Sequence, residues 1–322
     1  MQRSIEGTLP PPAPQRRAGP TTRVRRAIRV LGVVWLVLLV GFALYYTLDQ
    51  RSLHRPPQET VLAQQIEKAE EAVRTNPDDV IARIAVADLY LQAGRYQAAV
   101  EQYQEALRLS PSNLPAANGL ASAYLHLGQG EKAVPLLQEA IERNQGRKVL
   151  QTSDDMAEAH LRLGRIYLTQ GKADEARAEA AEAQKIAPAD ADILLLLGQA
   201  QAKGGDLQGA VEQYRKALRF VPKFPEAYQA LAEAYDGLED RSRAAYARAM
   251  AVYSRGDYSQ AAKDLKGLVR AQPELAEARL GLGMAYERLG KADGAAEEYR
   301  EALRLDPQLD YARTRLGALG ER

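Results

Sequence analysis

The sequence predicts an all-α protein in which a solenoid of stacked helical hairpins follows a single N-terminal transmembrane helix. Two observations support this fold class. From Val80 onward, one pattern of apolar residues, small residues, Gly and Pro returns with a period of about 34 residues. Before the repeats, Val30–Leu48 is an unbroken run without a charged side chain; it is about 19 residues long, which is enough to cross the hydrocarbon core of a bilayer as a helix.

The repeating unit is clearest in Val80–Asn113, which has the apolar spacing of two amphipathic helices, here called the first and second helix of a unit. Gly94 lies just past the first helix, where a left-handed cap favours glycine. Pro111 stops the second helix. Small residues recur where two helices approach closely; in this unit they are Ala87, Ala99 and Ala106, and in the next they are Ala121, Ala133 and Ala140.

This pattern resembles the tetratricopeptide repeat (TPR) family, whose 34-residue unit carries small residues at set helical places and a closing Pro. The resemblance implies a right-handed superhelix whose inner wall is made by the first helices. Full-length units are expected at 80–113, 114–147, 157–190, 191–224, 242–275 and 276–309. The unit 242–275 departs from the pattern, because it has Arg248 in a core position and Leu268 in a small-residue position.

Residues 1–29 are predicted to be a disordered, basic and Pro-rich tail. They carry seven Arg and one Glu, a net charge of +6, so the rest of the chain carries a net charge of −5. A tail that sets membrane topology is favoured over a polyproline ligand or a phosphate-binding arm.

The segment 30–48 is predicted to remain as an uncleaved membrane anchor. As a helix it spans roughly 28 Å, and Tyr45 and Tyr46 lie at one end, as in an interfacial aromatic belt. The alternative is a cleaved signal peptide, with Gly41-Phe42-Ala43 as its small-x-small site. The apolar run continues past that site, which favours the anchor.

The charges beside the anchor predict its orientation. Six Arg lie close before the span, whereas Arg51 and Arg55 follow it. The positive-inside rule then places the N-terminus in the cytoplasm and the repeats on the extracytoplasmic side of a single-pass membrane protein.

The remaining segments connect or cap the repeats. Residues 49–58 are expected to form a linker and 59–79 a capping helix that shields the first apolar layer. Residues 148–156 interrupt the stack 80–224 and are expected to be a longer loop, with Ser153 and Asp154 as helix N-caps. Residues 310–322 are expected to form a C-terminal capping helix.

Residues 225–241 break the 34-residue spacing as an irregular half-repeat before the stack 242–309. Both 225–238 and 242–255 match a first helix, with no second helix between them. An extra antiparallel helix would invert the polarity of everything after it, whereas a long or kinked helix across 225–254 would preserve it. Gly237 favours a kink, and a distorted junction is therefore predicted.

No chemistry of catalysis is recognisable in the sequence. Cysteine is absent, and the three His residues are far apart; His160 occupies a core position. No phosphate-binding loop, zinc motif or nucleophile elbow occurs. Neither a catalytic site, nor a cofactor, nor a metal is expected, and the net negative charge of the repeats disfavours nucleic acid.

The remaining candidate site is the groove that the TPR resemblance implies. Its inner wall mixes apolar residues with both charge signs, which suits an extended peptide or an amphipathic helix. Ile84 and Asp88 occupy places where related clamps for a C-terminal carboxylate use basic or amide residues, which excludes that mode. The predicted partner-binding residues are Ile84, Asp88, Leu91, Asn118, Ser122, Leu125, Leu161, Arg165, Leu168, Leu195, Gln199, Tyr246 and Met250, and Ile81 belongs to the same wall.

These features predict a membrane-tethered, non-catalytic scaffold or adaptor that binds peptide or helical segments of partner proteins. By analogy of architecture, its role lies in assembly of an envelope complex. The alternative is a substrate-recruiting subunit of a multi-chain enzyme. Small-molecule substrates are not expected.

Overall fold

A computed structural model describes residues 36, 38–45, 57–146 and 150–320. The chain divides into two compact units, 1–64 and 65–322, which are described separately. In the first unit, residues 36 and 38–45 are helical and their side chains are exposed. Across the described ranges, no helix combines the length and apolar character needed to cross a bilayer. The predictions for the tail, the anchor and the linker fall largely outside the described residues.

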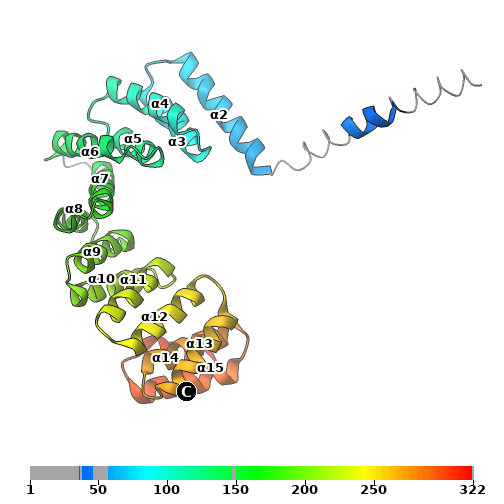
Figure 1. The fold of residues 1–322 in the computed structure, drawn as a ribbon, viewed down its shortest axis with the longest axis vertical. Coiled ribbons are helices and arrows are strands. Elements are labelled where there is room, and N and C mark those ends of the chain that lie inside the picture. Colours follow the sequence, from blue (N-terminus) through cyan, green and yellow to red (C-terminus); the bar gives the residue numbers. More distant parts are fainter. Residues whose placement is uncertain (1–35, 37, 46–56, 147–149, 321–322) are drawn as a thin grey trace, which may run out of the picture. The chain divides into compact units, whose positions relative to one another are not determined.

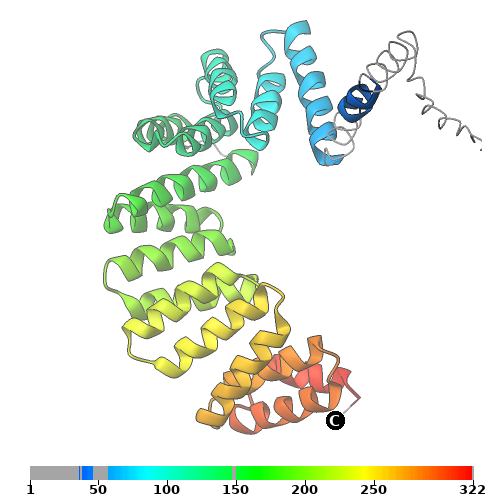
Figure 2. The ribbon, with the colours of Figure 1, turned by 45° about the vertical axis from the view of Figure 1, so that its right-hand side comes forward.

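The second unit is all-α, as predicted, and successive helices lie side by side (Figure 1, Figure 2). Helix α2 (Pro57–Thr75), which begins in the first unit, precedes the repeats, and its Glu70 accepts a hydrogen bond of 2.8 Å from the Tyr90 hydroxyl. Four hairpins follow: α3 (Val80–Gln92) with α4 (Tyr96–Leu109), α5 (Leu114–His126) with α6 (Gly130–Asn144), α7 (Leu150–Thr169) with α8 (Ala173–Ile186), and α9 (Ala191–Lys203) with α10 (Leu207–Phe220).

Each hairpin turns on one residue in the left-handed region. Gly94 has φ 72°, and the backbone N–H of Arg95 then reaches the carbonyl of Tyr90 at 2.8 Å. A side chain in this conformation carries a steric cost, which is why glycine recurs there.

Small residues let the paired helices approach closely. Ala99 and Ala106 are fully buried. A Cβ atom on Gly198 of α9 would lie only 2.5 Å from the ring of Tyr214 on α10. Any larger residue there would push the two helices apart.

The segment 148–156 does not form the expected loop in its described part. Helix α7 begins at Leu150 and runs through Met156 without a break, so Ser153 and Asp154 lie inside a helix instead of capping one. Asn118 of α5 contacts this segment, because its Nδ2 donates a hydrogen bond of 2.9 Å to the backbone carbonyl of Asp155.

First helices form a layer of their own. α3 contacts α5, α5 contacts α7 and α7 contacts α9, whereas no two second helices make comparable contact among the described residues. The first helices therefore lie closer together than the second helices, as the TPR resemblance implies.

The prediction of a long or kinked helix across 225–254 is wrong. Two separate helices, α11 (Pro225–Gly237) and α12 (Arg241–Ser254), pack as an antiparallel hairpin. The residue in the left-handed region of their turn is Glu239, at φ 61°. The Asp240 carboxylate caps α12 by accepting from the Arg243 backbone N–H at 3.0 Å.

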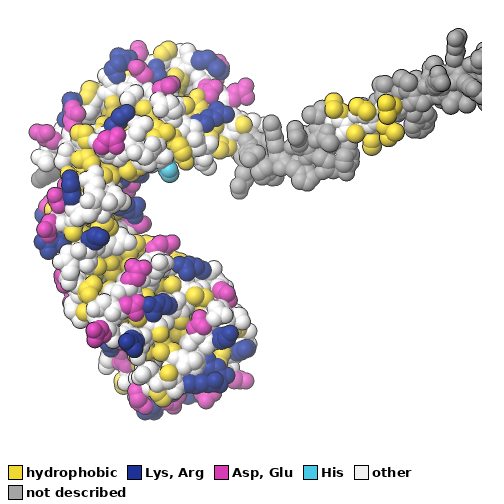
Figure 3. Space-filling model, in the orientation of Figure 1, with side chains coloured by type: hydrophobic (Ala, Val, Ile, Leu, Met, Phe, Trp, Pro, Cys, Tyr) yellow, Lys and Arg dark blue, Asp and Glu magenta, His cyan; other side chains and the backbone are white. Residues whose placement is uncertain are grey.

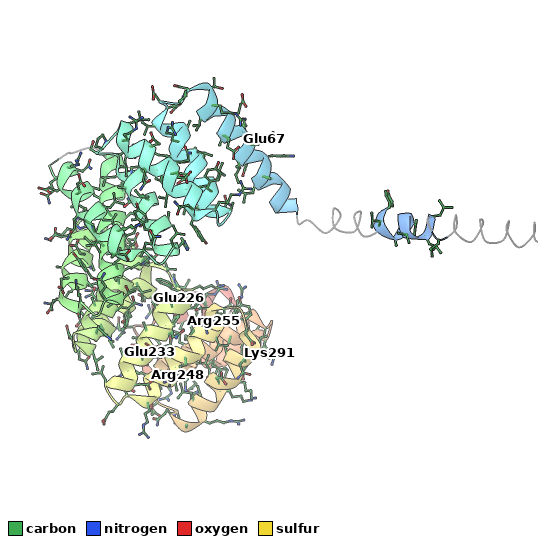
Figure 4. The ribbon with its side chains drawn as sticks, turned by 45° about the horizontal axis from the view of Figure 1, so that its top comes forward. Glu67, Glu226, Glu233, Arg248, Arg255 and Lys291 are labelled. Atoms are coloured by element: carbon green, nitrogen blue, oxygen red, sulfur yellow. The ribbon has the colours of Figure 1, made fainter. Side chains whose placement is uncertain are left out.

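Helix α12 has two roles. It packs against α11 in the place of a second helix, and it also packs as a first helix against α13 (Tyr258–Ala271) and α14 (Ala276–Arg288). This explains Arg248 in a core position: the side chain is exposed and forms an ion pair with Asp236 of α11. Figure 4 places Arg248 and Arg255 of α12 beside Glu226 and Glu233 of α11.

The extra helix reverses the direction of the first helices. Because successive helices are antiparallel, α12 and α14 run opposite to α9 and α11. The last described helices are α15 (Ala292–Leu305) and α16 (Asp310–Ala318), which lies where a capping helix was predicted.

Candidate functional site

The structure separates the thirteen predicted groove residues into an accessible set and a buried set. The accessible residues, which are exposed or half-buried, are Ile84, Asp88, Leu91, Ser122, Leu125, Arg165, Leu168, Gln199 and Tyr246. The buried residues are Asn118, Leu161, Leu195 and Met250.

The buried residues correct the sequence-based prediction of the groove. Leu161 is 4% exposed and packs with Ile193 and Leu196 of α9, so it is a core residue. Leu195 is likewise covered, in a core that includes Tyr228 of α11. The reason is that each first helix packs onto the next, which covers a position that would face solvent in an isolated hairpin.

Tyr246 and Met250 do not line the predicted groove, for a different reason. Both lie on α12, whose direction is reversed. Met250 packs against α14, where a Cβ on Gly281 would lie 3.0 Å from its Sδ. Tyr246 faces a cavity beside the second helix α10. Neither residue extends the face made by the first helices before the junction.

We define the first-helix face as the accessible residues of α3, α5, α7 and α9 named above, together with Ile81. Its apolar residues are concentrated in α3 and α5. Ile81 is 80% exposed and Leu125 is 40% exposed, whereas Ile84 and Leu91 are half-buried. A contiguous exposed apolar patch is typical of a binding surface, whereas single exposed apolar residues are normal.

The charged groups of this face have partners on neighbouring helices. Arg165 Nη2 lies 2.7 Å from Asp192 Oδ1 of the next first helix. Asp88 accepts a hydrogen bond from the Tyr103 hydroxyl of α4. Burial, then that hydrogen bond to the Asp88 carboxylate, raise the pKa of Tyr103 far above its ordinary value, so Tyr103 remains a neutral donor that positions Asp88.

The view in Figure 3 shows acidic, basic and apolar side chains interspersed along the repeats, without a large area of one charge. Across the described part of the chain, no group of three or more His, Asp or Glu side chains is arranged to hold a metal ion. His160 is half-buried, and its Nδ1 lies 2.7 Å from Glu179 Oε2, which is a structural contact between α7 and α8.

Comparisons with known proteins agree with the repeat pattern. One tetratricopeptide repeat model matches residues 161–225 and 246–310, and a second matches 90–149. A model of YpiA-like tetratricopeptide repeats matches 65–109. These matches together cover about two thirds of the chain. No curated protein matches the sequence.

Several solved structures are similar. A chain of the APC/C hetero-tetramer Cut9–Hcn1 is 18% identical with a TM-score of 0.48, and the alignment covers 80% of this chain but only 46% of that one. A tetratricopeptide repeat protein from Parabacteroides merdae is 15% identical with a TM-score of 0.46, over 82% of this chain and 94% of that one.

MamA from Desulfovibrio magneticus RS-1 is 19% identical with a TM-score of 0.47, over 55% of this chain and 94% of that one. The 34-residue pattern, the observed helical hairpins and the family matches agree. The chain belongs to the tetratricopeptide repeat family, whose repeat arrays act as protein–protein interaction scaffolds.

Proposed function

We propose that this protein is a membrane-tethered scaffold that binds a peptide or helical segment of a partner protein on the first-helix face. The observation that carries this proposal is the exposure of Ile81 and Leu125 on neighbouring first helices. A partner that covers Ile81 gains up to about 1.5–3 kcal/mol. The gain at Leu125 is less than half of this, because Leu125 is only 40% exposed before binding.

The composition of the face favours a partner segment that is amphipathic. Asp88 and Arg165 offer both charge signs, and Ser122 and Gln199 offer neutral hydrogen-bonding groups. Apolar anchors with scattered polar groups suit an extended strand or a helix laid across several repeats.

The proposed membrane tether is inferred from the sequence. Val30–Leu48 contains no charged side chain, and six Arg precede it closely. On this basis the N-terminus is cytoplasmic and the repeats are extracytoplasmic, where the scaffold takes part in assembly of an envelope complex.

Photo-crosslinking in native membranes tests the binding surface. A photoreactive residue replaces Ser122 in the full chain, and crosslinked partners are compared between the parent and an Ile81→Glu/Leu125→Glu variant. We expect at least a tenfold loss of the crosslinked product, because each Glu places a charge at a position that the bound partner would bury. Phe220→Glu is the matched control, since Phe220 is an exposed apolar residue (54%) of the second helix α10.

Undiminished crosslinking in the double variant rules out the first-helix face as the binding surface. An equal loss with Phe220→Glu also contradicts the proposal, because it means that any exposed apolar residue matters.

The tether has its own test. A reporter that is active only in the cytoplasm is fused after Arg322, and the membranes are extracted at alkaline pH. We expect an inactive reporter and a protein that remains in the pellet. Strong reporter activity, or release into the supernatant, contradicts the proposed topology.

A further inference from the structure

A cavity of about 190 Å³ lies at the junction created by the extra helix, and we call it the junction pocket. An apolar cavity of roughly 150 Å³ accommodates benzene, so the junction pocket has room for one aromatic side chain. Its walls come from α10, α11, α12 and α14; the lining residues are Arg215, Leu218, Arg219, Tyr228, Leu231, Tyr235, Arg243, Tyr246 and Glu277.

The sequence of α12 explains why the junction pocket forms. This helix occupies the place of a second helix beside α11, but its sequence is that of a first helix. It therefore presents Arg243 and Tyr246, which belong to first-helix positions, toward α10. The pocket lies beside second helix α10 and is separate from the first-helix face.

The floor of the pocket is apolar and aromatic, and it carries unpartnered hydroxyl groups. Tyr228 and Tyr235 are each 8% exposed, and Leu231 lies between them on α11. The hydroxyls of Tyr228, Tyr235 and Tyr246 make no hydrogen bond to another residue in the described part of the chain. Burial raises the pKa of Tyr228 to about 12, so its phenol is neutral and able to donate.

The rim is positively charged. Arg243 is occupied, with Nη1 2.9 Å from Asp240 Oδ2 and Nε 3.7 Å from Glu277 Oε1. Arg215 and Arg219 are exposed and form neither an ion pair nor a hydrogen bond within the described residues. Two free guanidinium groups thus stand one helical turn apart beside an aromatic floor.

The unpaired polar groups of the pocket are all able to donate hydrogen bonds, so its ligand should supply acceptors with negative charge. The apolar floor requires an aromatic or large apolar part in the same ligand. We infer that the junction pocket binds an aromatic side chain adjacent in sequence to an Asp or Glu of a partner protein, with the carboxylate held by Arg215 and Arg219.

This inference rests on the proposed function, since it names a second surface for protein partners. It also gives the reversed direction of α12 a role in binding. The chain would bind one partner segment on the first-helix face and another in the junction pocket.

Titration of the full chain with blocked dipeptides tests the inference. The protein carries ¹³C-labelled tyrosine, and single Tyr→Phe variants assign the signals of Tyr228, Tyr235 and Tyr246. The probes are N-acetyl-Phe-Asp-amide, its Phe-Asn counterpart, which lacks the charge, and its Ala-Asp counterpart, which lacks the ring.

We expect the Phe-Asp probe to shift the signals of the three pocket tyrosines at millimolar concentration. Loss of the charge should weaken binding roughly fivefold, as for about 1 kcal/mol of partly exposed ion pairing. Loss of the ring should abolish the shifts. Arg215→Gln/Arg219→Gln should bind the Asp and Asn probes equally, whereas Lys216→Gln, an exposed lysine of α10 outside the pocket, should keep the preference for Asp.

Absence of shifts at the three tyrosines overturns the inference, and so does equal binding of the Asp and Asn probes to the parent protein. Because the probes need no natural partner, these results are independent of the crosslinking experiment. If the titration fails but a partner is still crosslinked at Ser122, the proposed function stands and the inference does not. If the probes bind but no partner is crosslinked at Ser122, only the first-helix face is ruled out.

Discussion

Glu239 is the reason that the sequence did not reveal the turn between α11 and α12. It is the only non-glycine residue with positive φ in the described part of the chain, and it stands where Gly94 and Gly128 stand in other hairpins. The nearby Gly237 has another role, because a Cβ there would lie 2.7 Å from Leu207 Cδ1 of α10. The glycine in the sequence therefore marks a close contact, and the turn itself lacks its usual residue.

Glu239→Gly should stabilise the protein. The left-handed conformation costs a non-glycine residue about 1–2 kcal/mol, and the greater flexibility of Gly in the unfolded chain offsets roughly half of this. We expect a gain of about 0.5–1 kcal/mol, measured as a higher midpoint of chemical denaturation. Glu239→Ala is the control and should not stabilise; an equal gain there means that loss of the charge is responsible.

At the scale of helices, close packing depends on small residues within each hairpin. Ala176 of α8 is fully buried, and its carbonyl oxygen would lie 3.3 Å from a Cβ on Gly164 of α7. The two backbones thus approach too closely for a longer side chain at either position.

Ala176→Leu should force α7 and α8 apart and cost about 1–3 kcal/mol. Thermal unfolding followed by circular dichroism should show a lower midpoint. Ala178→Leu is the matched control, because Ala178 is exposed on the same helix and should change stability little. Equal effects of the two substitutions would mean that the close contact is not what Ala176 provides.

The last helix is held by a charged contact. Glu287 of α14 accepts hydrogen bonds from the Tyr299 hydroxyl of α15 at 2.8 Å and from Arg315 Nε of α16 at 3.1 Å. The hydrogen bond from Arg315 is the main reason that the pKa of Glu287 lies below its ordinary value of 4.5, although partial burial opposes it.

Because folding lowers the pKa of Glu287, its contribution to stability is present above pH 4.5 and is lost as pH falls through the lowered value. Glu287→Gln should therefore speed amide hydrogen exchange in α16 at pH 7. As the pH falls below 4.5, the difference from the parent protein should shrink. A difference that is constant with pH would show that the Glu287 carboxylate does not hold the helix by its charge.

At the scale of the whole repeat array, the junction decides how the units before and after it are oriented. Arg255 Nη2 of α12 lies 3.3 Å from Gln229 Oε1 of α11, which requires the two helices to fold back on each other. In one continuous helix, the sequence separation of 26 positions would span about 39 Å.

Spin labels on Gln229→Cys and Arg255→Cys distinguish these arrangements, and the absence of native cysteine makes the labelling specific. By pulsed electron paramagnetic resonance, we expect a distance far shorter than the span of the continuous helix. Labels at Gln104 and Tyr124, whose side chains lie 3.0 Å apart between α4 and α5, provide a short reference distance. A label distance close to the span of the continuous helix would disprove the hairpin.

The sequence by itself determined the helices, most of their turns and the contacts between small residues. These features are local: apolar spacing, Gly at a left-handed turn and Pro at a helix end act within one unit of about 34 residues. The same 34-residue spacing was sufficient to predict the repeat family.

Only the tertiary structure decided where α12 packs and which groove residues stay accessible. The sequence of α12 fits a first helix, but its neighbours α11 and α13 both offer a matching face, so it packs against both. Leu161 and Leu125 look equally exposed on an isolated helix, yet only Leu161 is covered by the next first helix. Burial of this kind depends on how closely successive units approach, and a pattern confined to one unit does not contain that distance.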